Sequence, residues 1–180
     1  MQLFFSLLAL VALAGGVGLI GLRLLPWPAG RAVGAAVSAY SAWLAWLVAA
    51  TATAGSLYFS EVANYPPCRL CWFQRICMYP MAVILLVGAI RRDRAVRWYA
   101  LPLAGIGIVI SAYHYLIEWY PSLEATSCDP VTPCTTVWFR RFGFASLPFM
   151  AGCGFLAIIA LLICRFRTDD DLTSEDLEEY

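Results

Sequence analysis

The sequence contains no lysine and only one histidine, and charged residues make up just 13% of its 180 residues. Hydrophobic residues account for 62%, and the mean hydropathy is +0.73. This composition is too apolar for an ordinary soluble domain of this length. Twelve arginines balance twelve acidic residues, so the net charge gives no indication of a nucleic-acid partner, and we expect none. The composition instead predicts a protein that lies in a lipid bilayer.

The sequence also lacks the short motifs of common redox and metal sites. It has no Cys-x-x-Cys-His haem motif, no flavin-type glycine fingerprint and no His-Glu-x-x-His metal motif. We therefore assign no residue to a metal. What the sequence does contain is seven cysteines, four of which form two pairs near expected loops.

Five apolar segments are long enough to cross a bilayer as helices, which takes about 20 residues. None of them shows strand-type alternation over a useful length, and lipid offers no partner for the backbone of an irregular segment. The sequence therefore predicts an all-α integral membrane bundle with spans Gln2–Leu25, Val33–Phe59, Trp72–Ile90, Trp98–Ile117 and Ala145–Cys164.

Arginines in the connections between spans predict the orientation, because short cytoplasmic loops carry an excess of them. Eight arginines fall on one side of the expected bundle, and the four on the other side are Arg69, Arg75, Arg140 and Arg141. The side with eight should be cytoplasmic, so loops 60–71 and 118–144 should face outward. Both cysteine pairs then lie in an oxidising space, where disulfides form and persist.

The two ends of the chain differ in character. The first apolar run has no basic residue before it, and its first arginine, Arg23, follows it. A secretory signal has a basic region before its apolar run, so we expect a retained helix with its N-terminus outside. Residues 168–180 are rich in acids and poor in apolar residues, which predicts a disordered cytoplasmic tail.

The first cysteine pair, Cys68 and Cys71, follows two prolines at the start of the third expected span. The pair should occupy the first turn of a helix, where proline is tolerated because it has no N–H to lose. Free N–H groups and the helix dipole stabilise a thiolate there, which lowers its pKa and makes it reactive.

Gln74 and Arg75 lie three and four residues after Cys71, on the same face of the expected helix. Arg75 is either a side chain that snorkels to lipid headgroups or the partner of an anion, which would be a Cys71 thiolate or an oxygen of an electron acceptor. The adjacent dithiol favours the second interpretation. Gln74 either belongs to the same site or forms a hydrogen bond between helices.

The second pair, Cys128 and Cys134, lies in a proline-rich loop that is unsuited to a continuous helix. Alone, such a pair is most simply a disulfide that restrains its loop. With a reactive dithiol on the same side, thiol–disulfide exchange between the pairs becomes possible. Electrons would then pass from an external protein, through the loop, to Cys68 and Cys71. The remaining cysteines are expected to be small core residues: Cys77, Cys153 and Cys164.

These electrons need a final acceptor. A small lipid-soluble oxidant that reaches Cys71 from within the bilayer fits the location, and a quinone fits the chemistry. Arg75 would stabilise negative charge on a quinone oxygen or on the attacking thiolate. The single histidine, His114, lies near the outer end of the fourth span, four residues before Glu118. It is either a hydrogen-bonding or proton-donating group for the quinone or a packing residue among aromatic neighbours.

Three stretches resemble the DsbB family of quinone-linked thiol oxidases, and most closely its compact BdbC-like members. They read GSLYFSEVANYPPCRLCWFQRICMYPMAVIL, SAYHYLIEWYPS and SCDPVTPCTTVWFRRFGFASLPFM, and they extend from about Gly55 to about Met150. The motif Pro-Cys-x-Leu-Cys-x-x-Gln-Arg, followed by two loop cysteines, is quite specific. Cys-x-x-Cys alone would be weak.

The resemblance implies a four-helix bundle in a bacterial cytoplasmic membrane. Such a protein reoxidises a DsbA-like thioredoxin-fold partner and passes the electrons to the membrane quinone pool, either ubiquinone or menaquinone. Cys68 and Cys71 match the pair that the quinone oxidises, with Cys71 nearest the ring. Cys128 matches the cysteine that forms a mixed disulfide with the partner, and Cys134 matches the one that exchanges with Cys68.

The same resemblance extends to the expected quinone site. Arg75 matches the arginine that supports the quinone, His114 resembles the family's histidine near it, and Gln74 belongs to the shared motif. The chain departs from the family in its extra first span and in its short cysteine loop. We therefore divide it into an extra helix with its connection (1–30), a family-like membrane domain (31–167) and the acidic tail (168–180).

Three alternatives account for parts of this pattern. A vitamin K epoxide reductase-like protein shares the bundle, the quinone and four cysteines, but its loop cysteines come before the Cys-x-x-Cys pair. A metal site of four thiolates suits zinc, but Arg75 would repel a cation, and thiols that face outward tend to be oxidised. A structural protein with two disulfides gives no reason for Arg75. A protein-dithiol:quinone oxidoreductase is the function that the sequence favours.

Overall fold

The computed structural model describes residues 1–24, 28–93, 95–124, 128 and 131–163. The expected acidic tail, residues 168–180, lies outside the described residues. The described chain is helical apart from its connections, as expected from the sequence. Its elements are α1 (Gln2–Leu24), α2 (Pro28–Leu57), the π-helix η1 (Tyr58–Val62), α3 (Arg69–Arg91), α4 (Val96–Trp119), the 3-10 helix η2 (Pro121–Leu123) and α5 (Leu147–Ile163).

Four helices in the described residues are long and apolar enough to cross a membrane, so the chain is a multi-pass membrane protein. The candidate spans are Gln2–Leu22, Val37–Val62, Arg69–Arg91 and Val96–Trp119. They correspond to the first four spans expected from the sequence. The fifth expected span, Ala145–Cys164, coincides with α5, which is apolar but described over only 17 residues. A fifth span is therefore not shown.

The helices pack through small residues that let their backbones approach closely, as is common within membranes. Gly107 of α4 faces the ring of Phe155 on α5, and Gly88 of α3 faces Val96 of α4. A side chain larger than hydrogen at either glycine would collide with that neighbour. Ala45 and Ala49 of α2 are fully buried in the same core. α2, α3, α4 and α5 therefore form one packed unit.

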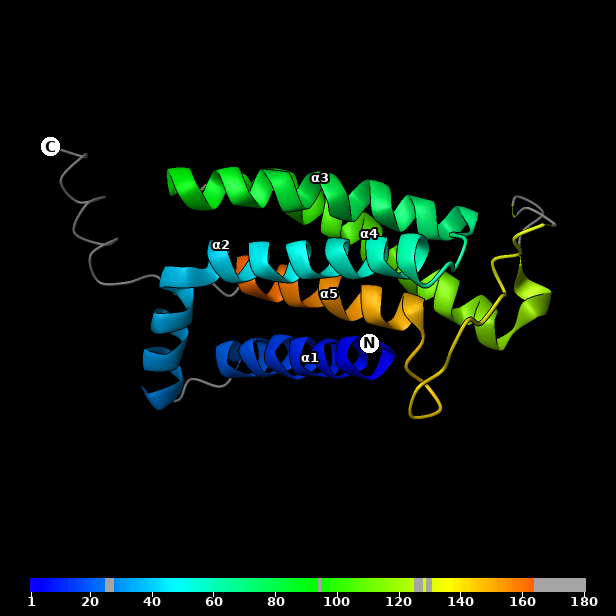
Figure 1. Cartoon of the computed structure of the whole chain (residues 1–180). Helices are drawn as coiled ribbons and strands as arrows, with labels where there is room; N and C mark the ends of the chain where they lie inside the picture. The colour runs from blue at the N-terminus through cyan, green and yellow to red at the C-terminus, as the bar shows by residue number, and fades with distance from the viewer. Residues whose placement is uncertain (25–27, 94, 125–127, 129–130, 164–180) are drawn as a thin grey trace, which may run out of the picture.

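The first helix, α1, lies along one face of this unit (Figure 1) and packs mainly on α5. The N-terminus of the chain, the start of α3 and the connection between α4 and α5 gather at one end of the bundle (Figure 1). That end carries both cysteine pairs. The other end of α3, where Arg91 is the last helical residue and Arg92 the C-cap, lies at the opposite end of the bundle (Figure 1). The two cysteine pairs thus share one end, as the sequence predicts.

Candidate active site

Cys68 occupies the N-cap position of α3. Its backbone is extended, and its sulfur accepts a hydrogen bond from the backbone N–H of Cys71, with 3.4 Å between sulfur and nitrogen. Oxygen-bearing side chains usually fill this position, because they satisfy N–H groups that the first helical turn leaves free. The sequence placed both cysteines in the first turn of the helix without indicating which sulfur the helix end holds. In the structure the capping sulfur is that of Cys68.

The two sulfurs of this pair lie 3.2 Å apart, within hydrogen-bonding distance. Both residues are thiols here. Cys68 is buried with 6% of its surface exposed, whereas Cys71 is partly exposed. A further donor, His114 of α4, places its Nε2 3.7 Å from the sulfur of Cys68. The Cys68 sulfur is therefore surrounded by groups that can donate to it.

Gln74 determines which nitrogen of His114 carries the proton. The amide nitrogen of Gln74 lies 3.5 Å from Nδ1 of His114 and donates a hydrogen bond to Ser111, with 3.2 Å between the heavy atoms. An amide N–H beside Nδ1 makes that nitrogen the acceptor when the imidazole is neutral, so the proton of the neutral ring is assigned to Nε2. Nε2 then donates to the carbonyl oxygen of Cys134 at 3.1 Å, with Cys68 close by. His114 thus joins the two cysteine pairs.

These contacts lower the pKa of Cys68 from 9.0 to about 4. The largest cause is the hydrogen bond from the Cys71 thiol to the ionised sulfur, and burial opposes it. The hydrogen bond from His114, the positive charge that this ring carries when it is protonated on both nitrogens, and the backbone N–H of Cys71 lower the pKa further. Each of these groups favours the charged form of the sulfur. In the reduced pair, Cys68 is the thiolate at neutral pH.

This pKa predicts the pH dependence of the reduced protein. Since the Cys68 thiol ionises at about pH 4, the ultraviolet absorbance of its thiolate should persist from neutral pH downward and disappear only as the pH falls through that value. His114→Phe should move this step to higher pH, because it removes an N–H donor. A reduced Cys68→Ser variant gives the baseline. A wild-type step at the ordinary thiol pKa would contradict the prediction.

The second pair, Cys128 and Cys134, is joined as a disulfide. Cys134 is fully buried and belongs to one cluster with Cys68, Leu70 and Ile117, against which Cys71 and Cys128 also pack. The carboxylate of Glu124 accepts a hydrogen bond from the backbone N–H of Cys134 at 2.8 Å. The loop is thereby held so that its disulfide lies beside the dithiol of α3.

A small cavity of about 170 Å³ opens beside the dithiol. Its lining includes loop residues around Val131 together with Cys68, Cys71, His114 and Glu118. Glu118 shares the His114 face of α4, as expected from their spacing, and both are buried. The carboxylate oxygen of Glu118 lies 3.9 Å from the guanidinium of Arg140.

Arg75 is buried, and its guanidinium donates two hydrogen bonds to Ser56 of α2. One reaches the hydroxyl and the other the carbonyl oxygen, both at 3.0 Å. The charge also lies over the rings of Trp72 and Tyr79, at 5.2 and 6.0 Å from their centroids. These contacts fix Arg75 between two helices, which is not the arrangement of a side chain that snorkels to headgroups. The partner that the structure gives it is Ser56, which sequence reasoning did not identify.

A second, larger cavity of about 370 Å³ lies beside Arg75. Cys71, Gln74 and Arg75 line it together with a mainly apolar wall from α1, α2 and α5. Cys71, Pro66, Trp138 and Leu147 line both cavities. Cys71 therefore faces the larger, apolar cavity on one side and the small cavity with Cys68 on the other.

The structure brings together every residue that the sequence singled out for the site. Ser56, Ser111 and Glu124 are partners that the sequence argument missed. A small polar residue within an apolar span is a weak signal for an interhelical hydrogen bond, and this signal was present at Ser56 and Ser111. Glu124 had no comparable pattern, because only the folded loop brings it near Cys134.

The structure also bears on the three remaining cysteines and on the alternative of a metal site. Cys77 and Cys153 are buried core thiols, and Cys164 lies outside the described residues. Among the described residues, Cys68, Cys71 and His114 form one group with metal-ligand spacing, and Glu124, Cys128 and Cys134 form another. Because Cys128 and Cys134 are bonded to each other, their sulfurs are not thiolate ligands in this state.

Comparisons with known proteins give a consistent result. The family model described as "Disulfide bond formation protein DsbB" matches residues 38–164. A "Probable disulfide formation protein" of Oceanobacillus iheyensis is 45% identical over 118 residues, which are 64% of this chain and 81% of the relative. A "Probable disulfide formation protein C" of Halalkalibacterium halodurans is 47% identical over 118 residues, 64% of this chain and 83% of the relative.

The "Disulfide bond formation protein C" of Bacillus subtilis is also similar to this chain. It is 41% identical over 121 residues, which are 67% of this chain and 87% of the relative. No solved structure matches the chain significantly. The helix α1 lies outside the residues that the family model matches.

Proposed function

This chain belongs to the DsbB family of disulfide bond formation proteins, and on that basis we propose that it is a membrane thiol oxidase. In this proposal it reoxidises a DsbA-like, extracytoplasmic thioredoxin-fold protein and passes the electrons to membrane quinone. The observation that carries the proposal is the single cluster in which the Cys128–Cys134 disulfide packs beside the Cys68 and Cys71 thiols.

We further propose that α2 to α5 form the four-helix family core and that α1 is an additional span. In this arrangement α5 crosses the membrane as the fifth span. Both cysteine pairs face the extracytoplasmic side of a bacterial cytoplasmic membrane, and the arginine-rich end of the bundle faces the cytoplasm. The count of arginines at the two ends supports this orientation. The proposed domain limits remain 1–30, 31–167 and 168–180.

The first half of the reaction moves electrons from the partner to the loop. A thiolate of the partner attacks the sulfur of Cys128, the Cys128–Cys134 bond breaks, and Cys134 leaves as a thiolate. When the pair on α3 is oxidised, Cys134 then attacks Cys68, the Cys68–Cys71 bond breaks, and Cys71 takes the electron pair. The packing of Cys134 against Cys68 supports this transfer.

The second half releases the partner and restores the loop. The partner's second thiolate attacks its own mixed disulfide, so the partner leaves oxidised and Cys128 becomes a thiolate. Cys128 attacks Cys134, which re-forms the loop disulfide and frees the Cys68 thiolate. The result is a closed loop disulfide and a reduced pair on α3, the state found in the structure. The N–H of His114 and the helix end stabilise the Cys68 thiolate as it leaves.

The reduced pair needs an oxidant, and the larger cavity fits a quinone. Its volume and largely apolar wall are typical of small-molecule sites that hold a few polar groups. Cys71 would face the ring and Arg75 would donate to its oxygens, while Gln74, which lines the same cavity, would hold Nδ1 of His114. A bound quinone would accept two electrons from the reduced pair, one proton from the Cys71 thiol and a second proton from solvent, because Cys68 is already ionised. Arg75 would stabilise the negative charge that develops during this oxidation.

A trapping experiment tests the proposed partner and the role of Cys128. In a Cys134→Ser variant, Cys128 remains as a thiol without its disulfide partner, so it should form a stable mixed disulfide with an oxidised thioredoxin-fold protein. Non-reducing electrophoresis and mass spectrometry of the linked peptides identify the cysteine and the protein. Cys128→Ser is the matched control and should give no such adduct at residue 134. Equal adducts in both variants would contradict the assigned order of the loop cysteines.

A further inference from the structure

The helix α1 supplies one wall of the cavity that contains Cys71 and Arg75. The residues of α3 that line this cavity share it with five residues of α1: Phe5, Leu8, Ala9, Val11 and Ala12. We propose that α1 is part of the quinone site and that Leu8 contacts the bound quinone, an inference that rests on the proposed function. The proposal adds residues of α1 to the quinone site, and these residues lie outside the part of the chain that the family model matches.

Close packing fixes α1 against α5 in one register. A Cβ atom at Gly16 would lie 3.3 Å from the backbone of Ala157, which is tighter than ordinary contact. At its other end, the hydroxyl of Ser6 lies 3.7 Å from the sulfur of Met150. Ser6 is fully buried. These two contacts hold α1 along α5. The helix α1 is therefore an integral part of the bundle, and its side chains that line the cavity have defined positions.

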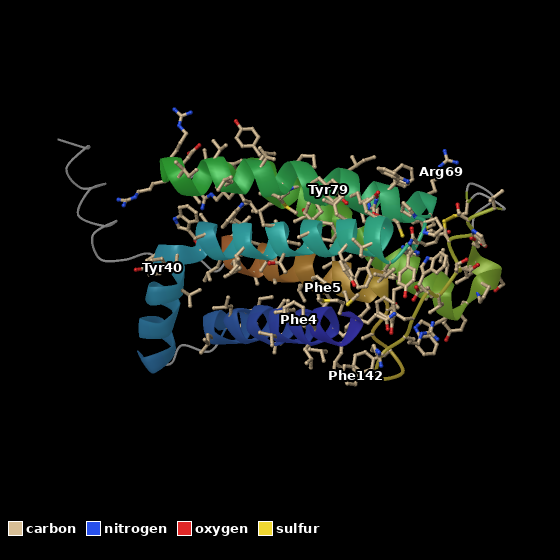
Figure 2. The ribbon with its side chains drawn as sticks, in the orientation of Figure 1. Phe4, Phe5, Tyr40, Arg69, Tyr79 and Phe142 are labelled. Atoms are coloured by element: carbon tan, nitrogen blue, oxygen red, sulfur yellow. A yellow bond between two sulfur atoms is a disulfide. The ribbon has the colours of Figure 1, made fainter. Side chains whose placement is uncertain are left out.

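Phe5 fixes α1 against α2 near the cavity. Its ring points from α1 toward the rest of the bundle (Figure 2) and rests on Gly55, where any side chain would collide with it. It also lies 5.5 Å from the ring of Phe59, measured between centroids. Because the Gly55 position admits only hydrogen, α1 approaches α2 closely one residue before Ser56, the residue that holds Arg75.

The start of α1 is also connected to a residue that lines both cavities. The amide of Gln2 donates a hydrogen bond to the hydroxyl of Tyr65 at 2.9 Å. The ring of Tyr65 stacks on that of Trp138, with centroids 5.0 Å apart and planes 9° apart. Trp138 lines both cavities. The position of α1 is thus connected by direct contacts to a residue beside both cysteine pairs.

The physical consequence concerns quinone binding rather than thiol exchange. Without α1, the side of the cavity between α2 and α5 would face lipid. With α1 in place, apolar quinone surface is buried against protein side chains, and burial contributes free energy in proportion to its area. Substitutions on the cavity face of α1 should therefore change quinone affinity. They should leave exchange between the loop disulfide and the dithiol unchanged, because that step occurs in the other cavity.

Two neighbouring leucines provide a matched test. Leu8 lines the cavity, whereas Leu7 is 49% exposed on another face of α1. Leu8→Trp should fill part of the cavity and weaken equilibrium binding of a short-tailed ubiquinone analogue about tenfold, on the scale of overpacking costs. Leu7→Trp should bind as the wild type does. A photoreactive azidoquinone should label residues 2–22 in the wild type and less so in Leu8→Trp.

Thiol exchange without quinone serves as the folding control. Each oxidised variant is mixed with one equivalent of a reduced thioredoxin-fold protein, and the rate of transfer to Cys68 and Cys71 is measured; both variants should match the wild type. Equal quinone affinity in Leu8→Trp, Leu7→Trp and the wild type would overturn the role of α1 and leave the proposed function intact. Failure of the wild type itself to bind the analogue would overturn both.

Discussion

Cys71→Ser should reduce quinone-dependent oxidation of the partner roughly a thousandfold or more, the scale of loss when a covalent group is removed. A serine oxygen cannot form the disulfide that carries the electrons. The Cys68 thiolate would still be able to attack the Cys134 sulfur of the loop disulfide and release Cys128 as a thiolate, so the variant should accumulate a Cys68–Cys134 disulfide. Turnover is measured as loss of partner thiols with quinone present, and the disulfide is located by peptide mapping without reduction.

Cys77 provides the control for this substitution. It lies on the same helix, is buried with 5% of its surface exposed, and packs in the main core. Cys77→Ala should retain most of the turnover, because its thiol takes no part in the exchange. Full activity in Cys71→Ser would remove the dithiol of α3 from the reaction and with it the proposed mechanism.

Arg75→Gln should raise the KM for quinone about tenfold to a hundredfold, the effect of losing one hydrogen bond to a charged group. Glutamine is shorter and uncharged, so the positive charge beside Cys71 and the two hydrogen bonds to Ser56 are lost or weakened. The KM for the reduced partner should stay near its wild-type value, because the partner reacts at the loop. Steady-state kinetics with each substrate varied in turn measures both constants.

Arg69 is the matched control for charge. It is the first residue of α3 and points away from the bundle (Figure 2), and it does not line the larger cavity. Arg69→Gln removes the same charge from the same helix and should leave the KM for quinone unchanged. If Arg75→Gln instead raised the KM for the partner and spared that for quinone, Arg75 would belong to partner recognition.

The fold was largely predictable because apolar length alone decides which segments cross lipid. The helices α1 to α4 occupy the segments expected from the sequence, with ends that differ by a few residues. Glu118 shows why the ends differ. It was placed at the start of the outer loop, yet α4 continues to Trp119. A charged residue near a span end does not mark the last helical turn, because hydrogen bonding within the helix continues beyond the apolar run.

The site was predictable in its members but not in its contacts. Short spacing places Cys68, Cys71, Gln74 and Arg75 within about two turns of helix, so their proximity follows from helix geometry. The same geometry does not say which sulfur caps the helix, and only the structure shows that it is the sulfur of Cys68. The extended backbone of the single residue before the helix, Cys68, decides this point.

The sequence by itself determined that the chain is an α-helical membrane protein with two cysteine pairs at one end, because hydrophobic length and local spacing act within one segment at a time. Only the tertiary structure decided that His114 joins Cys68 to Cys134, that Ser56 holds Arg75, and that α1 closes the cavity beside Cys71. These contacts join residues from different helices. Their geometry depends on how the helices rotate and pack against one another, which no single segment encodes.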